Sequence, residues 1–81
     1  MDFSIINVLD SNLGSLQDVP VKVIYENNGS EEVVFNGFSD FIGQVFFSHQ
    51  HRGKARIFLK EEFHSELKLP CFKSIVCKHC F

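Results

Sequence analysis

The stretch that decides the fold is PVKVIYENNGSEEVVF, residues 20–35. Residues 21–26 alternate between two faces, and Pro20 stands at the first strand position, where a missing N–H is tolerated. Asn28-Gly29 readily supplies the positive φ angles that a tight hairpin turn needs. Residues 31–35 then return as the partner strand, so the stretch predicts a β-hairpin.

Further short runs of β-branched and aromatic residues lie on both sides of this hairpin, separated by turn-forming residues. They predict strands at residues 3–9, 44–47, 55–59 and 72–76. The segment 60–68 differs, because Phe63 and Leu67 stand four residues apart, with acids early and Lys68 late. We therefore predict a mainly β protein of about six strands, with one short helix near residues 60–68 that Pro70 ends.

Composition limits the class of protein. The chain has 81 residues, of which 44% are hydrophobic and 22% are charged, which is typical of one small folded domain spanning residues 1–81. The net charge of −2 gives no electrostatic basis for binding nucleic acid. No apolar run approaches the about 18 residues of a membrane span, and the start lacks the base of a signal peptide. We expect a cytoplasmic protein without a membrane partner.

Charge is unevenly spread along the chain. Residues 1–51 hold seven acids and one base, Lys22, whereas residues 52–81 hold seven bases and three acids. A contact between the two halves, within one chain or between two chains, would therefore be favoured, though weakly if it is exposed to solvent. The alternative interpretation is two ordinary solvated faces.

The chain is rich in Phe, with 10 in all. Most of them recur at positions that the predicted strands and helix would turn inward. An aromatic binding platform is the alternative, but this recurrence favours the core. We therefore predict core positions for Phe35, Phe38, Phe41, Phe46, Phe47, Phe58, Phe63 and Phe72.

The cysteines form a weak candidate metal site, made of Cys71, Cys77 and Cys80. A histidine, His79 or His64, could complete four tetrahedral zinc ligands, but the second C-x-x-C or H-x-H of strong zinc patterns is absent. A redox role is disfavoured because the C-x-x-C follows a strand rather than opening a helix. We assign neither a metal nor a cofactor.

Two further histidine motifs have structural alternatives. His49 and His51 could present two imidazoles to a metal, but their neighbours Ser48, Arg52 and Gly53 favour an exposed loop. His64 and Ser65 are adjacent in sequence, which is not the geometry of a nucleophile and its base.

Several stretches, taken in order, carry the pattern of a known family. They are residues 6–14 (INVLDSNLG), 19–23 (VPVKV), 37–45 (GFSDFIGQV), 53–57 (GKARI), 61–68 (EEFHSELK) and 69–76 (LPCFKSIV). This ordered set, which covers nearly the whole chain, resembles the transthyretin and hydroxyisourate hydrolase family. The resemblance implies a transthyretin-like antiparallel β-sandwich, with eight strands and one helix in the family, assembled into homo-oligomers.

The resemblance also implies where a site would lie. In the family's hydrolase, water opens a purine-derived ring between subunits, and the family's first-strand His falls on Asn7 while its Arg falls on Gln44. His79 could echo a later H-x-H segment, whereas the family's C-terminal Tyr-Arg-Gly-Ser has no counterpart.

These replacements bear on activity. Neither Asn nor Gln takes up a proton near neutral pH, so an acid–base contribution of about 10²–10⁴ in rate would be missing. Gln44 also lacks the cationic fork that holds an anionic ring. We expect a relative of the hydrolase in purine catabolism that is weakly active or inactive and holds a purine-derived ligand at Asn7 and Gln44. The alternative is a non-catalytic ligand-binding or protein-interaction module.

The resemblance ends where two of the family's eight strands would begin. We therefore expect the domain to be incomplete at its C-terminus and the strand at residues 3–9 to form an unpaired sheet edge. The alternatives are that partner subunits cover this edge or that the C-terminal residues pair differently. A peroxisomal location, which the resemblance allows, would need a targeting tripeptide that is not seen.

Overall fold

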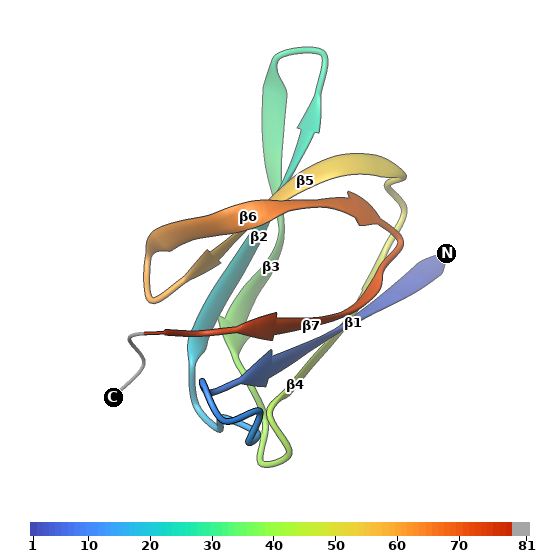
Figure 1. The fold of residues 1–81 in the computed structure, drawn as a ribbon. Coiled ribbons are helices and arrows are strands. Elements are labelled where there is room, and N and C mark those ends of the chain that lie inside the picture. The colour runs from blue at the N-terminus through green and yellow to red at the C-terminus, as the bar shows by residue number, and fades with distance from the viewer. Residues whose placement is uncertain (79–81) are drawn as a thin grey trace.

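The computed structural model describes residues 1–78, and seven strands make up its regular structure (Figure 1). The strands are β1 (Asp2–Leu9), β2 (Pro20–Asn27), β3 (Ser30–Phe38), β4 (Gln44–His49), β5 (Gly53–Leu59), β6 (Glu62–Leu69) and β7 (Phe72–Val76). They form two sheets, ordered β4-β1-β7 and β3-β2-β5-β6. The prediction of a mainly β protein is confirmed. Within the described residues there is no helix, and so none long and apolar enough to cross a membrane.

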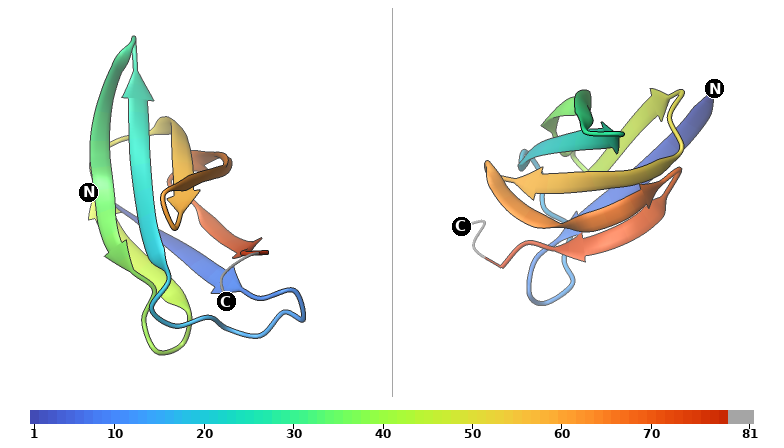
Figure 2. Two further views of the ribbon diagram at one scale, coloured as in Figure 1. Left: turned by 90° about the vertical axis from the view of Figure 1, so that its left-hand side faces the viewer. Right: turned by 90° about the horizontal axis from the view of Figure 1, so that it is seen from above.

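The two sheets share one apolar core. β-Branched and aliphatic residues dominate it, and they come from the inward positions of both sheets: Ile6, Val8, Val45 and Ile75 from one sheet, and Val21, Val23, Ile57, Leu59, Leu67 and Leu69 from the other. Burial on one face of each sheet follows the two-residue period of a strand. The architecture is that of a small β-sandwich (Figure 2).

The predicted hairpin at residues 20–35 is confirmed as β2 and β3. Its turn places Asn28 at φ 50° and Gly29 at φ 85°, and Asn27 pairs with Ser30 across the turn. Two successive positive φ angles match the twist of the flanking strands, which is why Asn-Gly is favoured there. The tip of this hairpin projects beyond the rest of the sandwich (Figure 1).

The predicted helix near residues 60–68 is wrong. Lys60 and Glu61 take φ angles of 53° and 69° and reverse the chain, so that β6 pairs antiparallel with β5. In β6, Leu67 and Leu69 are buried and the residues between and before them are more exposed. This alternation fits a strand, and the pairing with β5 overrides the single pair of apolar residues four positions apart.

The expectation of an unpaired edge at β1 is also wrong. β1 is the central strand of its sheet, antiparallel to β4 and parallel to β7. The parallel partner comes from the C-terminal part of the chain, with Ile5 opposite Phe72 and Leu9 opposite Val76. The C-terminal part of the chain thus covers the edge that β1 was expected to leave open.

Aspartates hold the two loops at the end of the sandwich opposite the hairpin tip. Asp10 Oδ1 accepts hydrogen bonds from the N–H groups of Asn12 (2.8 Å) and Gly14 (2.9 Å). Asp40 Oδ1 accepts equivalent bonds from Ile42 (3.0 Å) and Gln44 (2.9 Å). Such local bonds from a side chain to the backbone stabilise a turn.

Ser39 and Gly43 join these loops to each other. The buried Ser39 hydroxyl donates to the Leu16 carbonyl (2.7 Å) and accepts from the Val19 N–H (3.0 Å). Gly43 has φ 75°, and a side chain there would meet Ser15 and the backbone of Leu16 and Val8 at 2.9–3.0 Å. The turn residues that carry the family resemblance thus have structural roles in this chain.

The prediction that the Phe residues belong to the core is wrong for most of them. Phe47 is buried, and Phe35 and Phe58 are partly buried. Five others are 54–79% exposed, namely Phe38, Phe41, Phe46, Phe63 and Phe72. The smaller β-branched and aliphatic side chains fill the interior, and strand alternation or a loop position turns these Phe residues outward.

Candidate functional site

The outer surface of the sheet β4-β1-β7 carries both of the residues that the sequence singled out as a ligand site. Asn7 lies opposite Gln44 across the β1–β4 pair and opposite Ser74 across the β1–β7 pair. Gln44 Nε2 donates to Asn7 Oδ1 (3.3 Å), and Asn7 Nδ2 lies 3.5 Å from Ser74 Oγ. No motif in the sequence pointed to Ser74, and only the strand register brings it to this row.

Two carboxamides and a hydroxyl can donate and accept hydrogen bonds, but they do not exchange protons near neutral pH. The row made by Asn7, Gln44 and Ser74 can therefore bind a polar group and cannot act as a general base. The third residue suggested by the family resemblance, His79, lies outside the described residues.

Aromatic side chains occupy the same surface beside this polar row. Phe3 and Phe46 stack with their ring centroids 5.4 Å apart and an interplanar angle of 20°. They are 58% and 56% exposed, and Phe72, on the other side of Ile5, is 77% exposed. We call this outer surface of β4, β1 and β7 the aromatic face.

The aromatic face is large and uncharged. In the described strands, every outward position of β1, β4 and β7 is apolar, hydroxyl-bearing or amide-bearing. The exposed parts of the three Phe rings amount to roughly 300–450 Å² of apolar surface, from the typical area of an aromatic side chain. Exposed apolar patches of this size often mark a binding surface.

A serine and a histidine with the geometry of a nucleophile and its base lie on the opposite, inner surface. Ser4 Oγ is 2.7 Å from His49 Nε2, and His49 Nδ1 is 2.9 Å from the His51 carbonyl oxygen. Because a carbonyl only accepts, Nδ1 carries the proton and Nε2 accepts from the Ser4 hydroxyl. Ser4 is 1% exposed and His49 is 6% exposed, so no substrate reaches the pair.

The prediction of an exposed loop at residues 49–51 is therefore wrong for His49, which ends β4 and faces inward. The alternation Val45, Phe47, His49 was the signal in the sequence that could have placed it. His51 is bound elsewhere: its ring stacks on Tyr25 at 4.5 Å, and Nε2 contacts the Glu32 carboxylate. The two imidazoles thus have separate partners.

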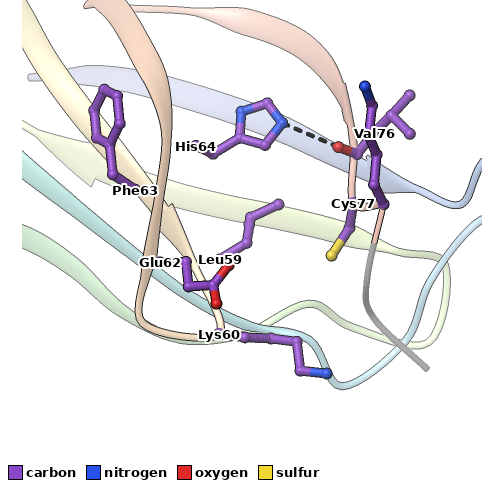
Figure 3. A pocket seen from close by; sticks show the side chains of 8 residues that line it. Leu59, Lys60, Glu62, Phe63, His64, Val76 and Cys77 are labelled. Atoms are coloured by element: carbon purple, nitrogen blue, oxygen red, sulfur yellow. Dashed lines mark hydrogen bonds between the residues drawn. The ribbon is translucent and has the colours of Figure 1, made fainter.

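A hollow of about 440 Å³ lies beside β6 and the end of β7 (Figure 3). Leu59, Phe63 and Val76 contribute apolar walls. His64, which occupies the bulge of β6, reaches across to β7, where Nε2–H donates to the Val76 carbonyl (3.0 Å). Its Nδ1 accepts from the Ser65 hydroxyl (2.8 Å). Both ring nitrogens are thereby engaged within the protein, so His64 binds β7 rather than offering a base.

The cysteines are not assembled into a metal site in the part of the chain that the structure describes. No group of three or more His, Cys, Asp or Glu residues within residues 1–78 is placed to hold a metal ion. Cys77 is buried, and Cys80 lies outside the described residues. Burial raises the pKa of the free Cys71 thiol, and this effect outweighs its hydrogen bond with Ser4 and the charge of Lys73.

The fold and the site define a small two-sheet β domain with an uncharged aromatic face. Comparison with known proteins adds no family: no protein-family model matches the chain, and a search among curated proteins finds no match.

Proposed function

We propose that this chain is a non-catalytic β-sandwich module that binds a second copy of itself through the aromatic face. The observation that carries the proposal is the stacked pair Phe3–Phe46 with Phe72 beside it, exposed on a sheet surface without charge. Exposure of such an apolar surface to water is unfavourable, and its burial takes no charge out of water.

A second copy is the occupant that the chemistry of the face favours. Two uncharged faces can stack without burying an unpaired charge. Sheets pack face to face about 10 Å apart, and a twofold axis would set the Phe residues of one copy on those of the other. The apolar area per copy is below the about 800 Å² per partner of a standard interface, so we expect a weak dimer that forms in the micromolar range.

Sedimentation equilibrium over a concentration series tests this proposal. The intact chain should dimerise, and Phe72→Ser should weaken the association by about tenfold, the loss expected from one aromatic anchor. Phe63→Ser is the matched control, because Phe63 is 54% exposed on the other sheet. A monomer at high micromolar concentration, or an equal effect of both substitutions, would contradict the proposal.

A second candidate is a transthyretin-like relative of hydroxyisourate hydrolase, acting in the cytoplasm on purine-derived ligands with little or no turnover. The adjacency of Asn7 and Gln44 favours it, because two carboxamides side by side could pair with the edge of a heterocyclic ring. In this proposal the ligand binds between the aromatic faces of two copies.

This candidate has its own assay. Freshly generated hydroxyisourate should decay at its spontaneous rate in the presence of the chain, as followed by absorbance. Decay well above that rate would contradict a non-catalytic role. Binding of urate as a stable probe should be weakened by Asn7→Ala, with Ser48→Ala on the same outer surface as the control.

A further inference from the structure

Three large apolar side chains point into solvent at the end of the sandwich opposite the hairpin tip. Leu13, in the β1–β2 loop, is 68% exposed, and Phe41 and Ile42, in the β3–β4 turn, are 79% and 49% exposed. Figure 1 shows both loops at this same end. We call Leu13, Phe41 and Ile42, with the aspartates of these loops, the loop end.

The loops present these side chains from ordered backbone. Asp10 and Asp40 each close a turn with two hydrogen bonds, and Ser39 joins the two loops as described above. Leu13 N–H also bonds the Asp10 carbonyl (3.0 Å). A partner therefore meets a preformed surface, and little conformational entropy is lost when it binds.

The same loops carry three carboxylates, on Asp10, Asp18 and Asp40. The turn hydrogen bonds of Asp10 and Asp40 use Oδ1, which leaves Oδ2 of each available to a cation. The nearest base in sequence, Lys22, is directed elsewhere, with Nζ 5.9 Å from the centre of the Phe58 ring. The loop end thus carries three exposed apolar side chains and three carboxylates on the same two loops.

We infer that the loop end docks a basic amphipathic segment of a partner protein. The apolar side of such a segment would cover Leu13, Phe41 and Ile42, and its Lys or Arg residues would meet the carboxylates. The same carboxylates repel an anionic lipid surface and the phosphates of nucleic acid. This inference does not rest on the aromatic face, which carries no charge and lies on a different part of the molecule.

Two synthetic peptides provide the probe. One has an amphipathic Leu/Lys pattern, and the other has the same pattern with Glu in place of Lys. We expect the Lys peptide to bind with a micromolar dissociation constant by isothermal titration calorimetry and the Glu peptide not to bind. Raising the salt concentration should weaken the binding, because exposed charge pairs are screened. Vesicles of phosphatidylcholine form a second arm, in which no binding is expected.

Variants separate this surface from the others. Phe41→Ser should weaken binding of the Lys peptide by about tenfold or more. Asp18→Asn should weaken it by a few-fold, because one negative charge is lost. Asn is chosen there because it also tolerates the φ of 61° at this position. Phe72→Ser and Phe63→Ser should leave it unchanged. Equal binding of both peptides, loss only with Phe72→Ser, or binding to the vesicles in place of the peptide would overturn the inference. Circular dichroism should show each variant folded.

Discussion

Ser4 and His49 are joined by a buried hydrogen bond of 2.7 Å that links the central strand β1 to its neighbour β4. The Cys71 N–H, just before β7, donates to the same hydroxyl at 3.0 Å, so one serine serves all three strands of this sheet. In an open cleft this geometry would suggest catalysis. Enclosed in the core, it satisfies buried polar groups and fixes the mutual position of the strands.

Ser4→Ala should destabilise the fold by about 1–3 kcal/mol, because it leaves the His49 ring nitrogen and the Cys71 N–H without a partner. Urea unfolding followed by circular dichroism measures the change. Ser48→Ala, at an exposed position of β4, is the control and should change the free energy of unfolding by less than about 0.5 kcal/mol. Equal effects would show that the buried network contributes nothing.

Gly43→Ala should lower the free energy of unfolding by more than about 2 kcal/mol. The new Cβ would lie 2.9–3.0 Å from Ser15 and from two backbone atoms, in addition to the strain of the positive φ angle. Gly29→Ala is a matched control: φ is 85°, but nothing lies within 4 Å of the added carbon, so only the conformational cost of about 1 kcal/mol remains. Thermal unfolding of both variants measures the difference. An equal fall of the two midpoints would contradict the prediction.

Glu61→Gly should stabilise the protein by about 0.5–1 kcal/mol, because Gly adopts the observed φ of 69° without strain. The sign of this change in the free energy of unfolding distinguishes a turn from a helix. In a helix the same substitution would cost about 1 kcal/mol. Glu62→Gly, one residue further at the start of β6, should destabilise slightly. Denaturant midpoints of the two variants on opposite sides of the unsubstituted protein are the expected result.

The stability that Cys71 contributes should decline at alkaline pH. Burial raises the pKa of this thiol in the folded state above the value of about 9 that it has in the unfolded chain. Above that value the unfolded state gives up a proton that the folded state keeps, so unfolding becomes more favourable as pH rises. Urea titrations of the unsubstituted protein and Cys71→Ala from about pH 7 to about pH 10 should show the protein losing stability relative to the variant. A constant difference would contradict this.

Local sequence signals predicted most of the strands. The hairpin at residues 20–35 could be predicted because Asn28-Gly29 and the flanking alternation act over neighbouring residues. The strand at residues 62–69 could not be predicted, because the interaction that forms it is its pairing with β5. The turn before it, at Lys60 and Glu61, also lacks the usual Gly or Asn.

The candidate site was predictable only in part. The family resemblance singled out Asn7 and Gln44, and the β1–β4 register places them side by side. Ser74 and the exposure of Phe72 depend on a parallel pairing between distant segments, which no local pattern specifies. The exposure of Phe41 depends on the Asp40 turn, whereas its recurrence with the other Phe residues had assigned it to the core.

The parallel pairing of β1 with β7 orders the events of folding. The hairpins β2–β3 and β5–β6 join neighbouring segments and can form within microseconds. β1 must instead wait for residues 72–76, across a closed loop that includes nearly every other strand. Pairing over such sequence distances is slow, on the order of milliseconds to seconds. Both hairpins can therefore form before the sheet that aligns Phe3, Phe46 and Phe72, and the proposed self-recognition through that surface would be reserved for chains that have finished folding.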